Sequence, residues 1–138
     1  MTKQDPVRIL LIEDEPPIAR LTTLLLQGEG YSVEAVSDQQ TASMLLTREP
    51  FDLIITDTDS GARTASLSGL APLIAGAGAR PVILFSAHRF PASMVSEAGL
   101  AGSIAKPYDI DDLLKTVSRI LVASSSKSEE SAIPSEQT

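Results

Sequence analysis

Short apolar runs alternate along this chain with longer segments in which apolar residues recur every three or four positions. A nearly continuous apolar run is typical of a strand that is buried on both faces, and the three-to-four period is typical of a helix that covers a sheet. The alternation therefore predicts an α/β domain with a parallel sheet. The strands are expected at 7–12, 31–36, 51–56, 82–85 and 102–105.

The helices expected between these strands have recognisable ends. Pro16 and Pro17 suit a first helical turn, and Gly28 and Gly30 end the helix that begins there. Asp109 is positioned to cap the last helix, which carries an apolar stripe. The other helices are predicted near 38–48, 68–76 and 91–99.

The spacing of apolar residues also predicts which side of a helix is buried. Ser37 and Gln40 form a capping box at the start of the second helix. The residues expected to face the core are Ile18, Leu21, Leu24 and Leu25 in the first helix and Ala42, Met44 and Leu45 in the second.

The last part of the chain differs in composition from the rest. Residues 123–138 are rich in Ser and Glu and carry few apolar side chains, so they bury too little area to offset the entropy of ordering. We therefore predict a domain over 1–122 and a disordered tail or linker over 123–138, in which no further output domain fits.

Charge and composition exclude several classes of function. The net charge is −7, there is no cysteine, and no apolar stretch approaches the length that spans a bilayer. Disulfides and thiolate metal sites are therefore excluded, and a nucleic-acid surface is disfavoured because it needs clustered basic residues. We expect a cytoplasmic protein with no direct DNA binding and no membrane contact.

Four of the predicted strands end at a polar residue. Glu13 and Asp14 follow the first strand, Asp57 the third, Ser86 the fourth and Lys106 the fifth. Because the carboxyl ends of parallel strands lie along one edge of a sheet, these side chains are expected to converge. Three carboxylates, a hydroxyl and an ammonium suit a divalent cation together with a phosphoryl group.

The residue types at these strand ends predict distinct chemical roles. The carboxylates of Glu13, Asp14 and Asp57 are enough to hold Mg²⁺, and an Asp carboxylate can accept a phosphoryl group as a nucleophile. Lys106 is expected to contact the acylphosphate and to balance the charge of Asp57 when no phosphate is bound. The hydroxyl of Ser86 is expected to donate to a phosphoryl oxygen.

This constellation resembles the receiver domain of bacterial two-component response regulators. The likeness covers about residues 7–122 and includes the pair Lys106-Pro107, which in that family has a cis peptide bond. The resemblance implies a flavodoxin-like (βα)5 doubly wound sandwich with a five-stranded parallel sheet of order 2-1-3-4-5. It also implies that a histidine kinase or phosphotransfer protein phosphorylates Asp57, and that the Asp59 backbone carbonyl is a further Mg²⁺ ligand.

The resemblance further implies a switch in protein contacts, with a downstream protein effector as partner. It admits a homodimer through the fourth helix, fifth strand and fifth helix. Ser103 stands where the family has a switch aromatic residue, and the loop after Asp57 departs from the family pattern. Asp59 and His88 each lie two residues beyond a site residue, and we hypothesise that their side chains tune the lifetime of the phosphoryl group.

Two other interpretations remain open from the sequence. Residues 53–59 also resemble the first motif of haloacid-dehalogenase phosphatases, for which Asp111-Asp112 could supply the acidic pair. The strand that carries Glu13 precedes that motif, which disfavours an enzyme. The second alternative is a receiver-like interaction module that acts without phosphorylation. We favour the phosphorylated receiver, which catalyses only its own phosphorylation and dephosphorylation.

Overall fold

The predicted parallel sheet is present in the structure, a computed structural model that describes residues 6–57, 67–87, 89–106 and 108–137. Within these residues the sheet has the order β2-β1-β3-β4-β5, and the pairings of neighbouring strands are parallel. This confirms the expected order. The strands are β1 Arg8–Ile12, β2 Ser32–Val36, β3 Leu53–Asp57, β4 Val82–Ser86 and β5 Gly102–Ala105.

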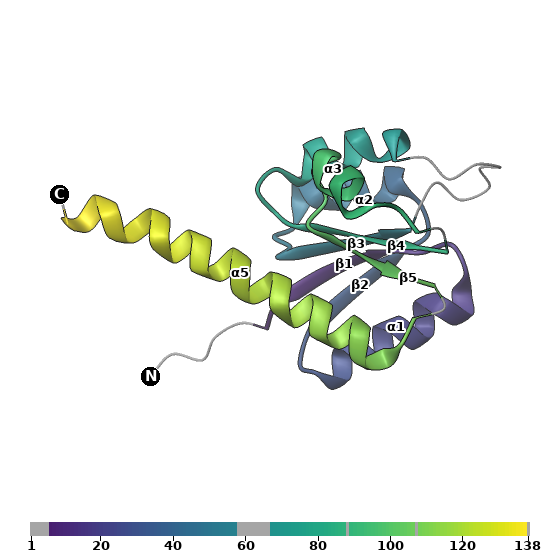
Figure 1. The fold of residues 1–138 in the computed structure, drawn as a ribbon. Coiled ribbons are helices and arrows are strands. Elements are labelled where there is room, and N and C mark those ends of the chain that lie inside the picture. The colour runs from purple at the N-terminus through teal and green to yellow at the C-terminus, as the bar shows by residue number, and fades with distance from the viewer. Residues whose placement is uncertain (1–5, 58–66, 88, 107, 138) are drawn as a thin grey trace.

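Helices cover both faces of this sheet. Helices α1 and α5 lie on one face, and α2 and α3 lie on the other (Figure 1). Gly30 and Gly99 have φ angles of 94° and 93°, and these left-handed residues end α1 and α4 as the sequence predicts. The elements are α1 Pro16–Gly28, α2 Gln39–Arg48, η1 Ser68–Leu70, α3 Ala71–Ala77, α4 Ala92–Glu97 and α5 Ile110–Gln137.

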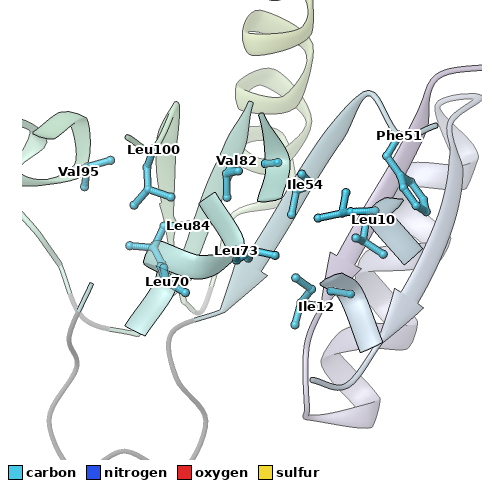
Figure 2. Close-up of a cluster of buried hydrophobic side chains, with 13 residues drawn as sticks. Leu10, Ile12, Phe51, Ile54, Leu70, Leu73, Val82, Leu84, Val95 and Leu100 are labelled. Carbon is cyan, nitrogen blue, oxygen red and sulfur yellow. The ribbon is translucent and has the colours of Figure 1, made fainter. Parts of the chain in front are cut away.

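The core consists of two apolar layers separated by the sheet. Successive strand residues point to opposite faces, so Leu10 and Ile12 of β1 pack with α2, α3 and α4, whereas Ile9 and Leu11 pack with α1 and α5. Figure 2 shows the first layer, in which Leu84 of β4 joins Leu10 and Ile12. The sheet therefore lies between two layers of helices, whose packing positions its strand ends.

The buried face of α1 differs from the predicted one. Leu21 and Leu24 are 49% and 59% exposed, while Thr22 and Leu26 are buried. Thr22 can be buried because its Oγ1 lies 3.1 Å from the hydroxyl of Tyr108, a hydrogen bond that satisfies both groups. The spacing of apolar residues in the helix does not reveal that Thr22 has Tyr108 as a partner.

Two details of α2 also differ from the prediction. Asp38 is the N-cap, and its Oδ1 accepts a hydrogen bond of 2.7 Å from the backbone N–H of Thr41, so the Ser37–Gln40 capping box was wrong. Met44 is half-exposed rather than buried, while Ala42 and Leu46 are buried.

Helix α5 is longer than the sequence predicts. Its backbone is helical through Gln137 and extends away from the sheet (Figure 1), where a disordered tail over 123–138 was expected. Local hydrogen bonds satisfy the backbone groups along such a helix, and the composition of the segment does not reveal this continuation. The domain boundary at residue 122 stays a prediction. No helix in the described residues is both long and apolar enough to cross a membrane.

Candidate functional site

The carboxyl edge of the sheet brings three carboxylates together. Glu13 and Asp14 directly follow β1, and Asp57 is the last residue of β3, the neighbour of β1 in the sheet. One carboxylate oxygen from each residue lies within 4.8 Å of those from the other two. We call these three residues the acidic cluster.

Asp57 is the residue most affected by this crowding. It is only 9% exposed. Burial raises its pKa to about 7. The hydrogen bond that protonated Asp57 donates to Asp14 and the negative charges of Glu13 and Asp14 act in the same direction, while Lys106 opposes them. The free protein therefore keeps a substantial fraction of Asp57 protonated near neutral pH. A cation at the cluster would favour the ionised form.

Lys106 is the cation nearest to the cluster among the described residues. Its Nζ lies 2.7 Å from Oε1 of Glu13 and 3.9 Å from Oε2 of Glu15. It forms no such ion pair with Asp57 within the described part of the chain, and its close contact is with Glu13. Lys106 still acts on Asp57 at longer range.

Glu13 has an oxygen that is suited to a metal ion. Its Oε2 accepts a hydrogen bond of 3.2 Å from the backbone N–H of Glu15. Its Oε1 is buried and has no donor in hydrogen-bond geometry among the described residues, although the Lys106 ammonium lies close enough to neutralise its charge. A buried carboxylate oxygen without an aligned donor, next to two further carboxylates, fits the hard oxygen ligands that Mg²⁺ prefers.

Ser86 and Lys106 are held together by the backbone. Ser86 is the last residue of β4 and is buried, and its carbonyl accepts a hydrogen bond of 2.8 Å from the Lys106 N–H. Phe85 lies opposite Asp57 in the β3–β4 register, which places Ser86 one residue past the level of Asp57. The structure thus brings all five predicted strand-end residues to one edge.

Four other predicted residues are not placed at this site by the structure. Asp59 and His88 lie outside the described residues, as does Pro107 of the Lys-Pro pair. Ser103 is exposed on β5 and lines a separate pocket of about 250 Å³ with residues of α5. The proposed roles of Asp59, His88 and Ser103 stay predictions.

Three residues around Lys106 were not predicted from the sequence. Glu15 is its second ion-pair partner, and the ring of Phe85 lies 5.2 Å from its Nζ. The ring of Tyr108 packs on Phe85 at a centroid distance of 5.1 Å. The signals were present, since Glu15 directly follows the two acids and Tyr108 lies two residues after Lys106.

The family follows from a match to a sequence model described as response regulator receiver domain, which covers residues 9–118. The chain belongs to this family. It is therefore a receiver domain of two-component signalling, and the phosphatase interpretation loses its support. The receiver domain is a signalling domain whose acidic pocket binds Mg²⁺ in the family, and this chain has the corresponding acidic cluster.

Individual relatives agree with this assignment. The chain is 30% identical over 130 residues to the transcriptional regulatory protein GlrR of Escherichia coli, a match that covers 91% of this chain and 28% of GlrR. Its fold matches that of NtrX from Brucella abortus, solved with ADP, with a TM-score of 0.79 at 27% identity over 92% of this chain and 30% of NtrX. TrrA from Thermotoga maritima, solved with Mg²⁺-BeF, matches with a TM-score of 0.70 at 24% identity over 83% of this chain and 98% of TrrA.

The comparison with GlrR corrects one expectation. The chain spans little more than a quarter of the length of GlrR, which is named as a transcriptional regulatory protein. The prediction that there is no direct DNA binding is therefore not supported.

Proposed function

We propose that this receiver domain accepts a phosphoryl group on Asp57 from a histidine kinase or phosphotransfer protein, with Mg²⁺ held by Glu13, Asp14 and Asp57. The observation that carries the proposal is the convergence of three carboxylates within 4.8 Å, next to the ammonium of Lys106. Such an excess of negative charge around a nearly buried Asp serves a site that takes up positive charge and phosphate.

The reaction needs Asp57 in its ionised form. A carboxylate oxygen of Asp57 attacks phosphorus, an O–P bond forms, and the bond between phosphorus and the donor's nitrogen or oxygen breaks with its electron pair leaving to the donor. Bound Mg²⁺ supplies positive charge that favours ionised Asp57 and neutralises the phosphoryl oxygens. We propose no turnover beyond this phosphorylation and its reversal by water.

Lys106 and Ser86 handle the charge that arrives with the phosphoryl group. The Lys106 side chain is flexible and carries three N–H donors, so its ammonium can move from Glu13 to a phosphoryl oxygen. The Ser86 hydroxyl donates to another phosphoryl oxygen. The backbone hydrogen bond between Lys106 and Ser86 keeps both residues at the same edge of the sheet. We propose that this rearrangement of Lys106 and Ser86 changes contacts with a downstream protein effector.

Phosphorylation of the intact chain by acetyl phosphate and Mg²⁺ tests this proposal. Mass spectrometry should show the addition of one phosphoryl group to the parent and none to Asp57→Asn. A matched control is Asp52→Asn, because Asp52 precedes β3 at the opposite edge of the sheet and contacts Arg8 instead of the cluster. Labelling of the control should equal that of the parent. No adduct on the parent would favour the interaction module that acts without phosphorylation.

The remaining partner assignments follow from the same proposal. We propose that the chain acts in the cytoplasm, where its kinase and effector would meet it, and that phosphorylation promotes a homodimer through α4, β5 and α5. Light scattering of the parent with and without beryllofluoride and Mg²⁺ measures the dimer. An unchanged molar mass would reject it.

A further inference from the structure

We infer that Glu15 is a positioning residue for Lys106, which receives the ammonium when a divalent cation displaces it from Glu13. This inference rests on the proposed Mg²⁺ site. It concerns a residue outside the acidic cluster that acts through Lys106.

The first observation is that Lys106 is the counter-ion of Glu13. The Glu13 side chain has no exposed surface, and its charge is neutralised by Lys106 Nζ at 2.7 Å. A divalent cation bound by Glu13 would bring its positive charge close to that ammonium. Two neighbouring cations repel each other strongly in a partly buried site, so Lys106 must leave Glu13 as the cation binds.

The second observation is that the Glu15 carboxylate lies close to the Lys106 ammonium. Its Oε2 already lies 3.9 Å from Lys106 Nζ, and charge-assisted hydrogen bonds of this kind are about 2.8 Å long, so a shift of about 1 Å completes the contact. The Glu15 side chain is 60% exposed and can make that movement at low cost. Glu15 therefore offers Lys106 a partner that the cation does not compete for.

The third observation is that, among the described residues, Lys106 is the one ion-pair or hydrogen-bond partner of the Glu15 carboxylate. Glu15 is the N-cap residue of α1, but its side chain makes no capping hydrogen bond. The bond between Glu15 and Glu13 comes from the backbone N–H, which a side-chain substitution leaves in place. Glu15→Gln thus removes the charge with little other change.

A double-mutant cycle measures the coupling. Mg²⁺ is titrated calorimetrically into the full chain as the parent, Glu15→Gln, Lys106→Gln and the double variant. We expect Glu15→Gln to weaken Mg²⁺ binding about two- to fivefold in the parent, the range for a solvent-exposed ion pair, and to have no effect when Lys106 is already Gln. Glu29→Gln is the matched control, because Glu29 is an exposed Glu at the far end of α1, and it should bind Mg²⁺ like the parent.

The cycle separates the possible failures. An equal loss in both backgrounds would show that Glu15 acts on the cation directly, and no loss in either would show that it does not act; each result overturns the inference. A parent that binds no Mg²⁺ would reject the proposed metal site itself, and this inference with it.

A second measurement covers the case in which Lys106→Gln does not fold. In protein labelled with ¹³C-lysine, the Lys106 side-chain signals should move on addition of Mg²⁺ to a different end point in Glu15→Gln than in the parent and in Glu29→Gln. Identical end points in all three proteins would overturn the inference.

Discussion

The two edges of the sheet differ in how completely their charged side chains are paired. At the amino edge, Arg8 forms an ion pair of 2.6 Å with Glu49, donates to the carbonyl of Pro50 at 3.3 Å and stacks over the ring of Phe51. Its backbone N–H donates to Asp52 at 2.9 Å. The Arg8 cation thus has partners on several sides, an arrangement that needs nothing from solution.

At the carboxyl edge the charges do not balance. The three carboxylates of the acidic cluster share the influence of Lys106, and burial together with the negative charges of Glu13 and Asp14 raises the pKa of Asp57. The charged groups at the amino edge are paired within the fold. The carboxyl edge has more carboxylates than cations. The difference indicates that an unbalanced edge, rather than the mere presence of charged residues, marks the functional site.

The largest effect is expected from breaking the ion pair at the carboxyl edge. Lys106→Met leaves Glu13 buried without a counter-ion and should lower the free energy of unfolding by about 3–5 kcal/mol in metal-free buffer. Urea unfolding measures this. Addition of Mg²⁺ should restore part of the loss, because the cation replaces the ammonium. A loss of unfolding free energy below about 1 kcal/mol is the size expected for an exposed ion pair, and it would contradict the prediction that Glu13 needs Lys106 as a counter-ion.

A smaller and pH-dependent effect is expected at Asp57. Its pKa is about 7 in the folded chain, whereas the ordinary pKa of an Asp carboxyl is 3.8, so the folded state binds the proton more tightly. The contribution of Asp57 to stability is therefore complete below about pH 4 and is lost as the pH rises through about 7. Asp57→Asn should be more stable than the metal-free parent by about 2–4 kcal/mol at pH 8 and nearly equal to it at pH 4.

Urea unfolding of both proteins across this pH range tests the sign. A difference in unfolding free energy that stays constant with pH would mean that Asp57 is not responsible. A difference that grows as the pH falls would contradict the direction of the shift.

Metal binding should distinguish the two edges directly. At a Mg²⁺ concentration ten times the dissociation constant, the parent should gain about 1.4 kcal/mol of stability. Asp14→Asn should lose most of this gain, because it removes one ligand of the acidic cluster. Thermal unfolding followed by circular dichroism measures both. Equal gains in the parent and in Asp14→Asn would remove Asp14 from the metal site.

The smallest effect is expected at the amino edge. Arg8 and Glu49 are both partly exposed, so Glu49→Gln should cost less than about 1 kcal/mol of unfolding free energy and leave Mg²⁺ binding unchanged. A measurable change in Mg²⁺ affinity would show that the two edges are coupled.

The strands and their polar ends were predictable because both are local features. A run such as Leu53–Thr56 and the acid that follows it occupy neighbouring positions in the sequence, and a parallel sheet places all such ends together. The positions of Glu13, Asp14, Asp57, Ser86 and Lys106 followed from this rule alone.

The features that could not be predicted depend on distant partners. Thr22 is buried in place of Leu21 because of Tyr108, which lies 86 residues away. Lys106 pairs with Glu13 and Glu15 because the β1 and β5 ends meet at one edge with particular side-chain geometry. The spacing of residues along the chain does not reveal which distant side chains come into contact. The residue types at the site were therefore predicted, and their pairing was not.

The packing of Tyr108 on Phe85 also has a practical consequence. The chain has no tryptophan and only two tyrosines, so its near-ultraviolet absorption and intrinsic emission come largely from Tyr31 and Tyr108. Tyr108 lies two residues from Lys106, and its ring contacts the ring over which Lys106 is placed. The protein therefore carries its own optical probe beside the acidic cluster, and binding at that cluster can be followed without any attached label.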